Sequence, residues 1–284
     1  MKIALVTAIA AFALDDDLAP LAQAIRRADG RASIVAWDDP TVSWGRFDLA
    51  VLRSPWDYTQ RPAEFLDWCA HLDGHTRLLN PIGVVRWNTD KHYLADLEKA
   101  GVPIVDSVFI EPGEAAEKFP DYAEFVVKPA IGAGSRDTQR YIRSERAAAV
   151  AHAQRLLDEQ RSVLVQPYLH EVDSAGETAL IFFNGVFSHA IRKGPLLSRG
   201  EGPTQALFAT EQIEAREPSA AEFDVAHRAL AAIPYGTLAY ARIDLLPSAD
   251  GPRLLELELT EPSLFFDHAP GSSDRFAATL MSSS

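Results

Sequence analysis

The stretch EFVVKPAIGAGSRDTQR (residues 124–140) joins an apolar segment to a glycine-rich loop through a single lysine. The apolar residues 125–127 have the character of a buried β-strand, and Lys128 follows them directly. The loop that follows contains Gly132, Gly134 and Ser135. Glycines let backbone amides approach an anion closely, and a lysine ammonium neutralises phosphate. The stretch predicts a phosphate-binding loop, although glycine-rich turns after strands are also ordinary connections.

A second stretch, YARIDLLPSADGPRLLELELTEPSLFF (residues 240–266), presents charged side chains on two strand-like runs separated by a turn at 248–252. Alternation along a strand places Glu256 and Glu258 on one face, and a neighbouring strand can bring Asp244 alongside. Three adjacent carboxylates repel one another unless cations bind, so hard oxygen ligands for Mg²⁺ are the natural interpretation. The alternative is a solvent-facing strand edge. Together with the glycine loop, these acids predict a nucleotide bound with Mg²⁺.

Composition limits the classes of protein to which the chain can belong. Its 284 residues include 27 basic and 40 acidic side chains, for a formal charge of −13. This balance argues against a nucleic-acid surface and favours small-molecule partners. Cys69 is the single cysteine, which excludes a disulfide framework within one chain, and the histidines lack zinc-binding spacing. The composition leaves both a monomer and a homo-oligomer open.

The N-terminal run MKIALVTAIAAFALDDD is apolar, as a signal peptide would be. The aspartates at 15–17 interrupt it, and no polar cleavage region follows, so we interpret it as a first β-strand. No other apolar run reaches membrane-spanning length. We therefore expect a cytoplasmic protein without a membrane segment.

The spacing of apolar runs, glycines and prolines predicts an open α/β domain at 1–87, an α+β subdomain at 88–165 and a strand-rich region at 166–284. The loop Arg199–Pro203 is predicted to be mobile. Strands are expected at 3–6, 32–37, 49–52, 78–81, 105–110, 124–128, 162–166, 178–183, 186–193, 237–246 and 253–259. Helices are expected at 17–28, 88–100, 145–158 and 220–232, with a further helical pattern in AEFLDWCAHL.

The order of these motifs along the chain resembles the ATP-grasp superfamily. The resemblance rests on Asn88-x-x-Lys91, Val-Val-Lys128-Pro, the glycine loop, Val-Gln166-Pro-Tyr-Leu169, Arg242-x-Asp244 and Glu256-x-Glu258. It implies an N-terminal α/β domain that helps bind substrate and two α+β lobes that clasp ATP. It further implies that Lys91 and Lys128 neutralise the α- and β-phosphates. It implies two Mg²⁺ ions. Many members have Asn where Glu258 stands, and this difference leaves the geometry of the second ion open.

The resemblance also indicates how the rest of the nucleotide is held. The hinge between the lobes matches the residues whose backbone meets adenine, namely Gln166, Pro167, Tyr168 and Leu169. Tyr168 and Leu169 are equally compatible with an ordinary core. Asp173 is the candidate for the ribose hydroxyls because a carboxylate accepts two hydrogen bonds from a diol, and Glu171 is the competing candidate.

Further candidates lie on the predicted strands or in the turns that follow them. Arg242 shares the face of Asp244 and is expected to stabilise the transferred phosphoryl group or an oxyanion. Arg192 and Lys193 end the run FSHAIRK and are candidates to reach the γ-phosphate or a substrate carboxylate, unless they are a basic strand terminus. The turn after the third strand offers possible substrate contacts, although packing explains its rings nearly as well: Arg53, Trp56, Asp57 and Tyr58.

Four runs indicate a narrower group: LRSPWDY, QPYLHEVDSAGE, FSHAIRKGP and LLELELTEPSLFF. They are similar to the D-cycloserine synthetases, which cyclise O-ureido-D-serine. This similarity implies an ATP-dependent cyclo-ligase that releases ADP and phosphate, with loss of the carbamoyl group as carbon dioxide and ammonia. The alternatives are an intermolecular carboxylate–amine ligase and a nucleotide-binding regulator that has lost turnover.

Overall fold

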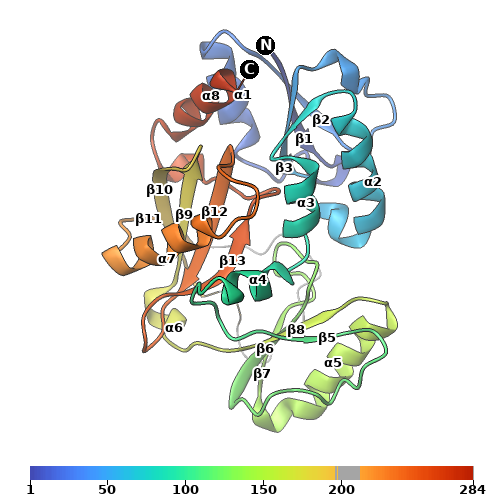
Figure 1. Cartoon of the computed structure of the whole chain (residues 1–284), viewed down its shortest axis with the longest axis vertical. Helices are drawn as coiled ribbons and strands as arrows, with labels where there is room; N and C mark the ends of the chain where they lie inside the picture. The colour runs from blue at the N-terminus through green and yellow to red at the C-terminus, as the bar shows by residue number, and fades with distance from the viewer. Residues whose placement is uncertain (196, 198–211, 284) are drawn as a thin grey trace.

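The computed structural model describes residues 1–195, 197 and 212–283, which form three β-sheets with helices packed against them (Figure 1). The mixture of one parallel and two antiparallel sheets confirms the predicted α/β and α+β class. Residues 199–203, predicted to be mobile, lie outside the described residues. Within the described residues, no helix is long and apolar enough to cross a membrane.

The N-terminal sheet is parallel, with strand order β2-β1-β3-β4. Its strands are β1 (Lys2–Thr7), β2 (Arg31–Ala36), β3 (Leu49–Ser54) and β4 (Arg77–Leu79). Helices α1 (Leu18–Arg27) and α2 (Pro62–Asp73) accompany it. All of β3 and nearly all of β1 are buried, which is typical of a parallel sheet covered on both faces. The predicted strands of this region are confirmed within two residues at each end.

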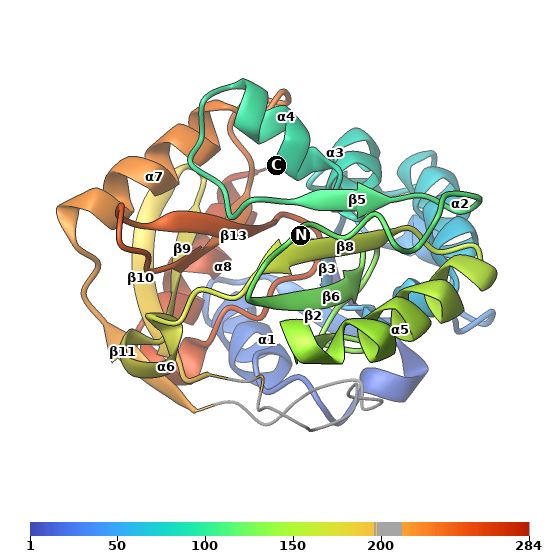
Figure 2. The same ribbon diagram turned by 90° about the horizontal axis from the view of Figure 1, so that it is seen from below.

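The central sheet is antiparallel, with strand order β5-β8-β6-β7. Its strands are β5 (Val108–Ile110), β6 (Glu124–Pro129), β7 (Gln139–Ile142) and β8 (Val163–Pro167). Helix α5 (Arg146–Asp158) lies along this sheet (Figure 2), and its Ala149, Ala153 and Leu156 share a core with Phe125 and Val165. Strand β7 was not predicted, because its sequence QRYI carries little apolar pattern.

The C-terminal sheet is antiparallel, with strand order β11-β10-β9-β12-β13. Its strands are β9 (Glu177–Phe183), β10 (Val186–Lys193), β11 (Ile213–Arg216), β12 (Tyr240–Leu246) and β13 (Arg253–Glu258). Helix α7 (Ala220–Ala231) packs on one face, and α8 (Ser272–Ser282) returns to pack between this sheet and α1 (Figure 1). The sequence did not predict β11, α8 or the short α6 (Val172–Ala175).

The single helix predicted at 88–100 is wrong. The chain instead forms α3 (Ile82–Asn88) and α4 (Tyr93–Lys99), separated by four residues. The side chain of Asn88 donates to the Leu257 carbonyl at 2.7 Å and accepts from the Leu259 amide at 2.6 Å, and Asp90 accepts from the His92 amide at 3.1 Å. Such side-chain bonds compete with helical ones and end a helix. Lys91 therefore lies in a turn rather than on a helix.

Short 3₁₀ helices complete the fold. They are η1 (Ile9–Ala11), η2 (Trp44–Arg46), η3 (Trp56–Gln60), η4 (Arg143–Glu145) and η5 (Phe266–His268). The η3 turn follows the carboxyl end of β3, where ligands commonly bind in open α/β sheets. This position brings the N-terminal domain to the cavity formed by the other two sheets.

Candidate active site

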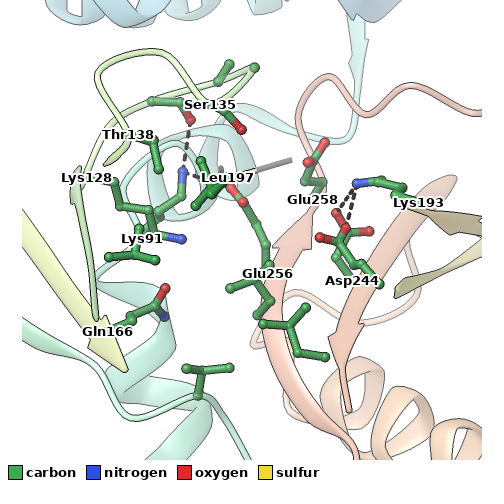
Figure 3. Close-up of a pocket in the computed structure, with 18 of the residues that line it drawn as sticks. Lys91, Lys128, Ser135, Thr138, Gln166, Lys193, Leu197, Asp244, Glu256 and Glu258 are labelled. Atoms are coloured by element: carbon green, nitrogen blue, oxygen red, sulfur yellow. Dashed lines mark hydrogen bonds and ion pairs between the residues drawn. The ribbon is translucent and has the colours of Figure 1, made fainter. Parts of the chain in front are cut away.

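A cavity of about 210 Å³ opens where the three sheets meet, and each sheet region contributes side chains to its lining. Trp56 and Tyr58 come from η3, Lys128 comes from β6, and Asp244 and Glu256 come from β12 and β13. Glu256 lies between Lys91 and Lys128 on one side and the Lys193–Asp244 pair on the other (Figure 3). The structure thus brings together residues that are more than 150 positions apart in the sequence.

The two predicted phosphate lysines both line the cavity and are both buried. Lys91 Nζ lies 2.8 Å from Glu256 Oε1 and donates to the Gly132 carbonyl at 2.9 Å. Burial acts to lower the pKa of Lys91, but the carboxylates of Glu256, Glu258 and Glu261 together outweigh it and the net shift is upward. For Lys128, burial dominates and lowers the pKa to about 8. Lys128 therefore remains mostly charged at neutral pH but within reach of titration.

The glycine loop curves over the same end of the cavity. Gly132, Gly134 and Ser135 line it, and the last two have positive φ angles of 61° and 59°. Asp137, also at positive φ, is held by Arg161 at 2.8 Å and Arg155 at 3.2 Å. These ion pairs anchor the loop's far end to α5 and to the turn after it. Consecutive residues at such φ angles are a feature of the backbone turns that bind anions.

The predicted adenine hinge lies on the cavity wall, since Gln166, Pro167, Tyr168 and Leu169 all line it. The buried Gln166 donates to Ser107 Oγ at 3.0 Å. The Tyr168 ring carries the Arg140 guanidinium 3.4 Å from its centroid, and its hydroxyl donates to Asp173. Asp173 and Glu171 are not among the described lining residues, so neither ribose candidate reaches the cavity directly.

Asp244 is the most enclosed of the predicted metal ligands, at 2% exposure. Arg242 donates to its two oxygens at 2.9 and 2.8 Å, and Lys193 donates at 2.9 Å. Burial acts to raise the pKa of Asp244, but these two cations outweigh burial and hold the pKa well below its usual range. Asp244 is therefore ionised throughout the physiological range.

Glu256 and Glu258 project beside Asp244, because the register pairs Asp244 with Glu256 and Arg242 with Glu258. Glu258 contacts the Arg242 guanidinium, and burial is the main cause that raises its pKa to about 8. Both glutamate side chains remain about one-quarter exposed, at 24% and 26%. In the described part of the chain, no three metal-ligating side chains are already gathered as they would be around a bound ion. The carboxylates are instead distributed among Lys91, Arg242 and Lys193.

Three other candidates do not line the cavity among the described residues: Arg53, Asp57 and Arg192. Arg192 donates to the carbonyls of Ala175 and Ser174 and so supports the end of α6. Asp57 accepts from the Trp37 indole at 2.9 Å and pairs with Arg61.

Glu261 is a cavity residue that the sequence reasoning missed. It is 9% exposed, and burial raises its pKa to about 7 although a hydrogen bond with Tyr58 acts in the opposite direction. The signal was its position three residues after Glu258, where the apolar alternation of β13 gives way to the polar run Thr-Glu-Pro-Ser. Glu261 follows the strand that carries the predicted metal ligands Glu256 and Glu258, so it lies close to them along the chain.

Comparison with known proteins identifies close relatives of this chain. Residues 3–80 match the family model described as "D-cycloserine synthetase DcsG, N-terminal domain". Cycloserine biosynthesis protein DcsG of Streptomyces lavendulae is 42% identical over 98% of this chain and 97% of its own length. The crystal structure of D-cycloserine synthetase DcsG superposes with a TM-score of 0.91 at 40% identity, over 100% of this chain and 99% of that one.

More distant structures share the fold alone. The ATP-grasp ligase PsnB, solved with a phosphomimetic variant of its minimal precursor, Mg and ADP, has a TM-score of 0.64 at 19% identity, over 99% of this chain and 97% of that one. Together with the close relatives, this likeness confirms the ATP-grasp fold that the motif order indicated. The chain belongs to the D-cycloserine synthetase family and is an ATP-dependent ligase.

Proposed function

We propose that this chain is the cyclo-ligase that converts O-ureido-D-serine to D-cycloserine at the expense of ATP. The observation that carries the proposal is the cavity, in which two buried lysines and a glycine loop face three carboxylates supplied by β12 and β13. A relative 42% identical over 98% of the chain is named for cycloserine biosynthesis, which supports the choice of substrate.

The lining residues fit ATP with Mg²⁺. Lys91, Lys128 and the amides of the glycine loop would hold the phosphates, while the hinge at 166–169 would hold adenine. Asp244, Glu256 and Glu258 supply hard oxygen ligands, and the two glutamates keep part of their side chains open to the cavity. We propose two Mg²⁺ ions, which when bound offset the charge on the transferring phosphoryl group. Asp173 is retained as the ribose candidate, because it accepts a hydrogen bond from the hydroxyl of the cavity residue Tyr168.

The chain's own side chains suit transfer of the γ-phosphate to a substrate carboxylate. Arg242 is held by Asp244 and Glu258, so its guanidinium is oriented before any ligand binds. From that position it would stabilise the phosphoryl group and the oxyanion formed at the acylphosphate. Lys193, held by Asp244 and Glu177, adds positive charge to the same wall.

Ring closure would then need orientation rather than a second substrate. The nitrogen bonded to oxygen in O-ureido-D-serine attacks its own activated carbonyl, and phosphate leaves. Tethering of nucleophile and electrophile can replace up to roughly 7–11 kcal/mol of bimolecular entropy. Hydrolytic loss of the carbamoyl group then yields carbon dioxide and ammonia. Trp56 and Tyr58 are the substrate contacts from the N-terminal domain that this scheme uses.

We propose separate binding roles for the three parts of the chain. We assign the substrate side to residues 1–87 and the nucleotide to lobes at 88–165 and 166–284, in a cytoplasmic enzyme whose partners are small molecules. Arg53, Asp57 and Arg192 act in this proposal as supports for the cavity walls rather than as ligands.

The test is ADP release by the purified protein with ATP, Mg²⁺ and O-ureido-D-serine, without any added amine. We expect the ring product to appear by mass analysis in step with ADP, and no AMP. If AMP accumulates, phosphoryl activation is wrong. If turnover requires a second amino acid, an intermolecular ligase replaces the cyclo-ligase, and ATP consumption that ignores every substrate points to a regulator.

A further inference from the structure

One carboxylate in the cavity differs from the others in its partners. Glu177 and Asp244 pair with Lys193 at 2.7 and 2.9 Å, Glu256 pairs with Lys91 at 2.8 Å, and Glu258 contacts Arg242. Glu261 lines the same cavity and is buried, at 9% exposure, yet in the described part of the chain no Lys, Arg or His nitrogen lies at ion-pair distance from it. Its side-chain partner is the uncharged Tyr58 hydroxyl.

The N-terminal domain holds this carboxylate in place. The Trp56 indole donates to the Glu261 carbonyl at 3.3 Å, and the fully buried Arg53 guanidinium donates to the Pro262 carbonyl at 2.5 Å. Tyr58 is 3% exposed and stacks on Phe65 with ring centroids 4.9 Å apart, so its hydroxyl has little freedom. Glu261 is therefore positioned by three residues of the run LRSPWDY, and two of them line the cavity with it.

An enclosed carboxylate without a cation in contact is costly, because burial removes the water that would solvate its charge. Lys91 and Arg242 act on Glu261 from a greater distance and offset that cost only in part. Arg242, which is proposed to stabilise the substrate's carboxylate end, lies on the wall beside Glu261. Its guanidinium donates to the Ser263 carbonyl at 3.1 Å, two residues beyond Glu261. An α-amino acid has an ammonium one carbon away from its carboxylate. A substrate bound with its carboxylate near Arg242 can present that ammonium to Glu261.

We propose that Glu261, oriented by Tyr58, binds the α-ammonium of the amino-acid substrate and makes the enzyme select substrates with a free α-amino group. The inference rests on the proposed ligase function, because it concerns the substrate end of the same cavity. Burial raises the pKa of the unliganded Glu261, and a bound ammonium would act to lower it again. Glu261 is a binding residue in this scheme and takes no proton from the nucleophile.

The test compares steady-state ADP release by the wild type, Glu261→Gln and Tyr58→Phe, with Glu98→Gln as a control on the exposed surface of α4. The substrate is O-ureido-D-serine or, if the wild type ignores it, whichever amino acid of a panel stimulates ADP release. We expect Glu261→Gln to raise the KM for the amino acid by about 10–100-fold, the loss of one charge-assisted contact. The KM for ATP and kcat should change little. Tyr58→Phe should raise the same KM by a smaller factor.

A second arm uses the analogue of the working substrate that lacks the α-amino group. The wild type should prefer the amino substrate strongly in kcat/KM, and Glu261→Gln should lose most of that preference while melting near the wild-type temperature. An undiminished preference would overturn the proposal, as would a fall in kcat with unchanged KM, which would indicate a proton acceptor. Wild-type inactivity toward O-ureido-D-serine alone would instead refute the cyclo-ligase assignment.

Discussion

Lys128 combines a cationic side chain with an almost fully enclosed position, and this combination makes its charge sensitive to pH. The groups that face it are Glu256, Asp244 and Glu177, which favour the charged form, and Lys91, which opposes it. Burial nevertheless dominates and places the pKa at about 8. Phosphate binding needs the ammonium, so protonation and nucleotide affinity are linked at this residue.

We predict that affinity for ATP with Mg²⁺ falls as pH rises above about 8. Below that pKa Lys128 already carries its proton, whereas above it binding must take up a proton, so the Kd rises by at most about tenfold per pH unit. Lys128→Ala should weaken binding by about 10–100-fold and lose this fall, leaving only the opposite pH dependence of Glu258, which becomes a charged metal ligand above about 8. Calorimetric titrations at several pH values measure both effects, with Lys128→Arg as the permanently charged control. Unchanged binding by Lys128→Ala would remove the residue from the phosphate site.

Glu256 is the carboxylate that links the two halves of the site, since it contacts Lys91 and lies opposite Asp244. Glu256→Gln keeps the volume but removes a charged Mg²⁺ ligand, so we predict a loss of turnover on the order of 100-fold or more with the fold intact. ADP formation and thermal melting should be measured together, with Glu98→Gln as the matched control. Near-normal turnover at saturating Mg²⁺ would exclude Glu256 as a metal ligand.

At the scale of elements, the residue preceding α1 holds a segment more than 240 positions away. The Asp17 carboxylate accepts from the backbone amides of Leu264, Phe265 and Phe266 at 2.5, 3.1 and 2.9 Å. Phe265 adopts a left-handed φ of 53°, and its ring lies 5.5 Å from the Arg242 guanidinium. Asp17 thus attaches the N-terminal sheet to the loop that lines the cavity beside Arg242.

We predict that Asp17→Asn destabilises the protein by roughly 1.5–3 kcal/mol, because an amide offers one acceptor oxygen and no charge to three amides. Each kcal/mol corresponds to a fall in melting temperature of about 2–4 °C in a chain of this size class. Turnover should fall as well, because the Phe265 ring beside Arg242 would no longer be held in place. Asp16→Asn, at the exposed neighbouring position, is the control. If the two variants melt together, the carboxylate does not hold the loop.

At the scale of the whole molecule, the cavity depends on all three sheet regions, so a ligand bound there stabilises their joint arrangement. We predict that ATP with Mg²⁺ raises the melting temperature, because a ligand at 100 times its Kd adds about 2.7 kcal/mol to a state that alone binds it. Removal of Mg²⁺ with a chelator should reverse most of this gain, and Lys128→Ala should show little of it. An equal shift with and without Mg²⁺ would contradict the proposed metal ligands.

The sequence by itself determined the fold class, the family and much of the cavity lining. Lys128 at the end of an apolar run, the glycine loop and Glu256-x-Glu258 are local patterns, and local patterns follow from strand alternation and backbone freedom. The relative faces of Arg242, Asp244, Glu256 and Glu258 were likewise predictable from a period of two, and the structure places them on one wall.

Only the tertiary structure decided which faces look into the cavity. Alternation places Arg192 and Lys193 on opposite faces of β10, but the packing of β9 and α6 determines that Lys193 turns toward the cavity. Glu261 gained its enclosure from Trp56 and Tyr58, about 200 positions earlier, and Asn88 ended its helix by bonding to the strand at 257–259. Contacts between distant segments depend on how whole sheets pack, and no local pattern encodes that packing.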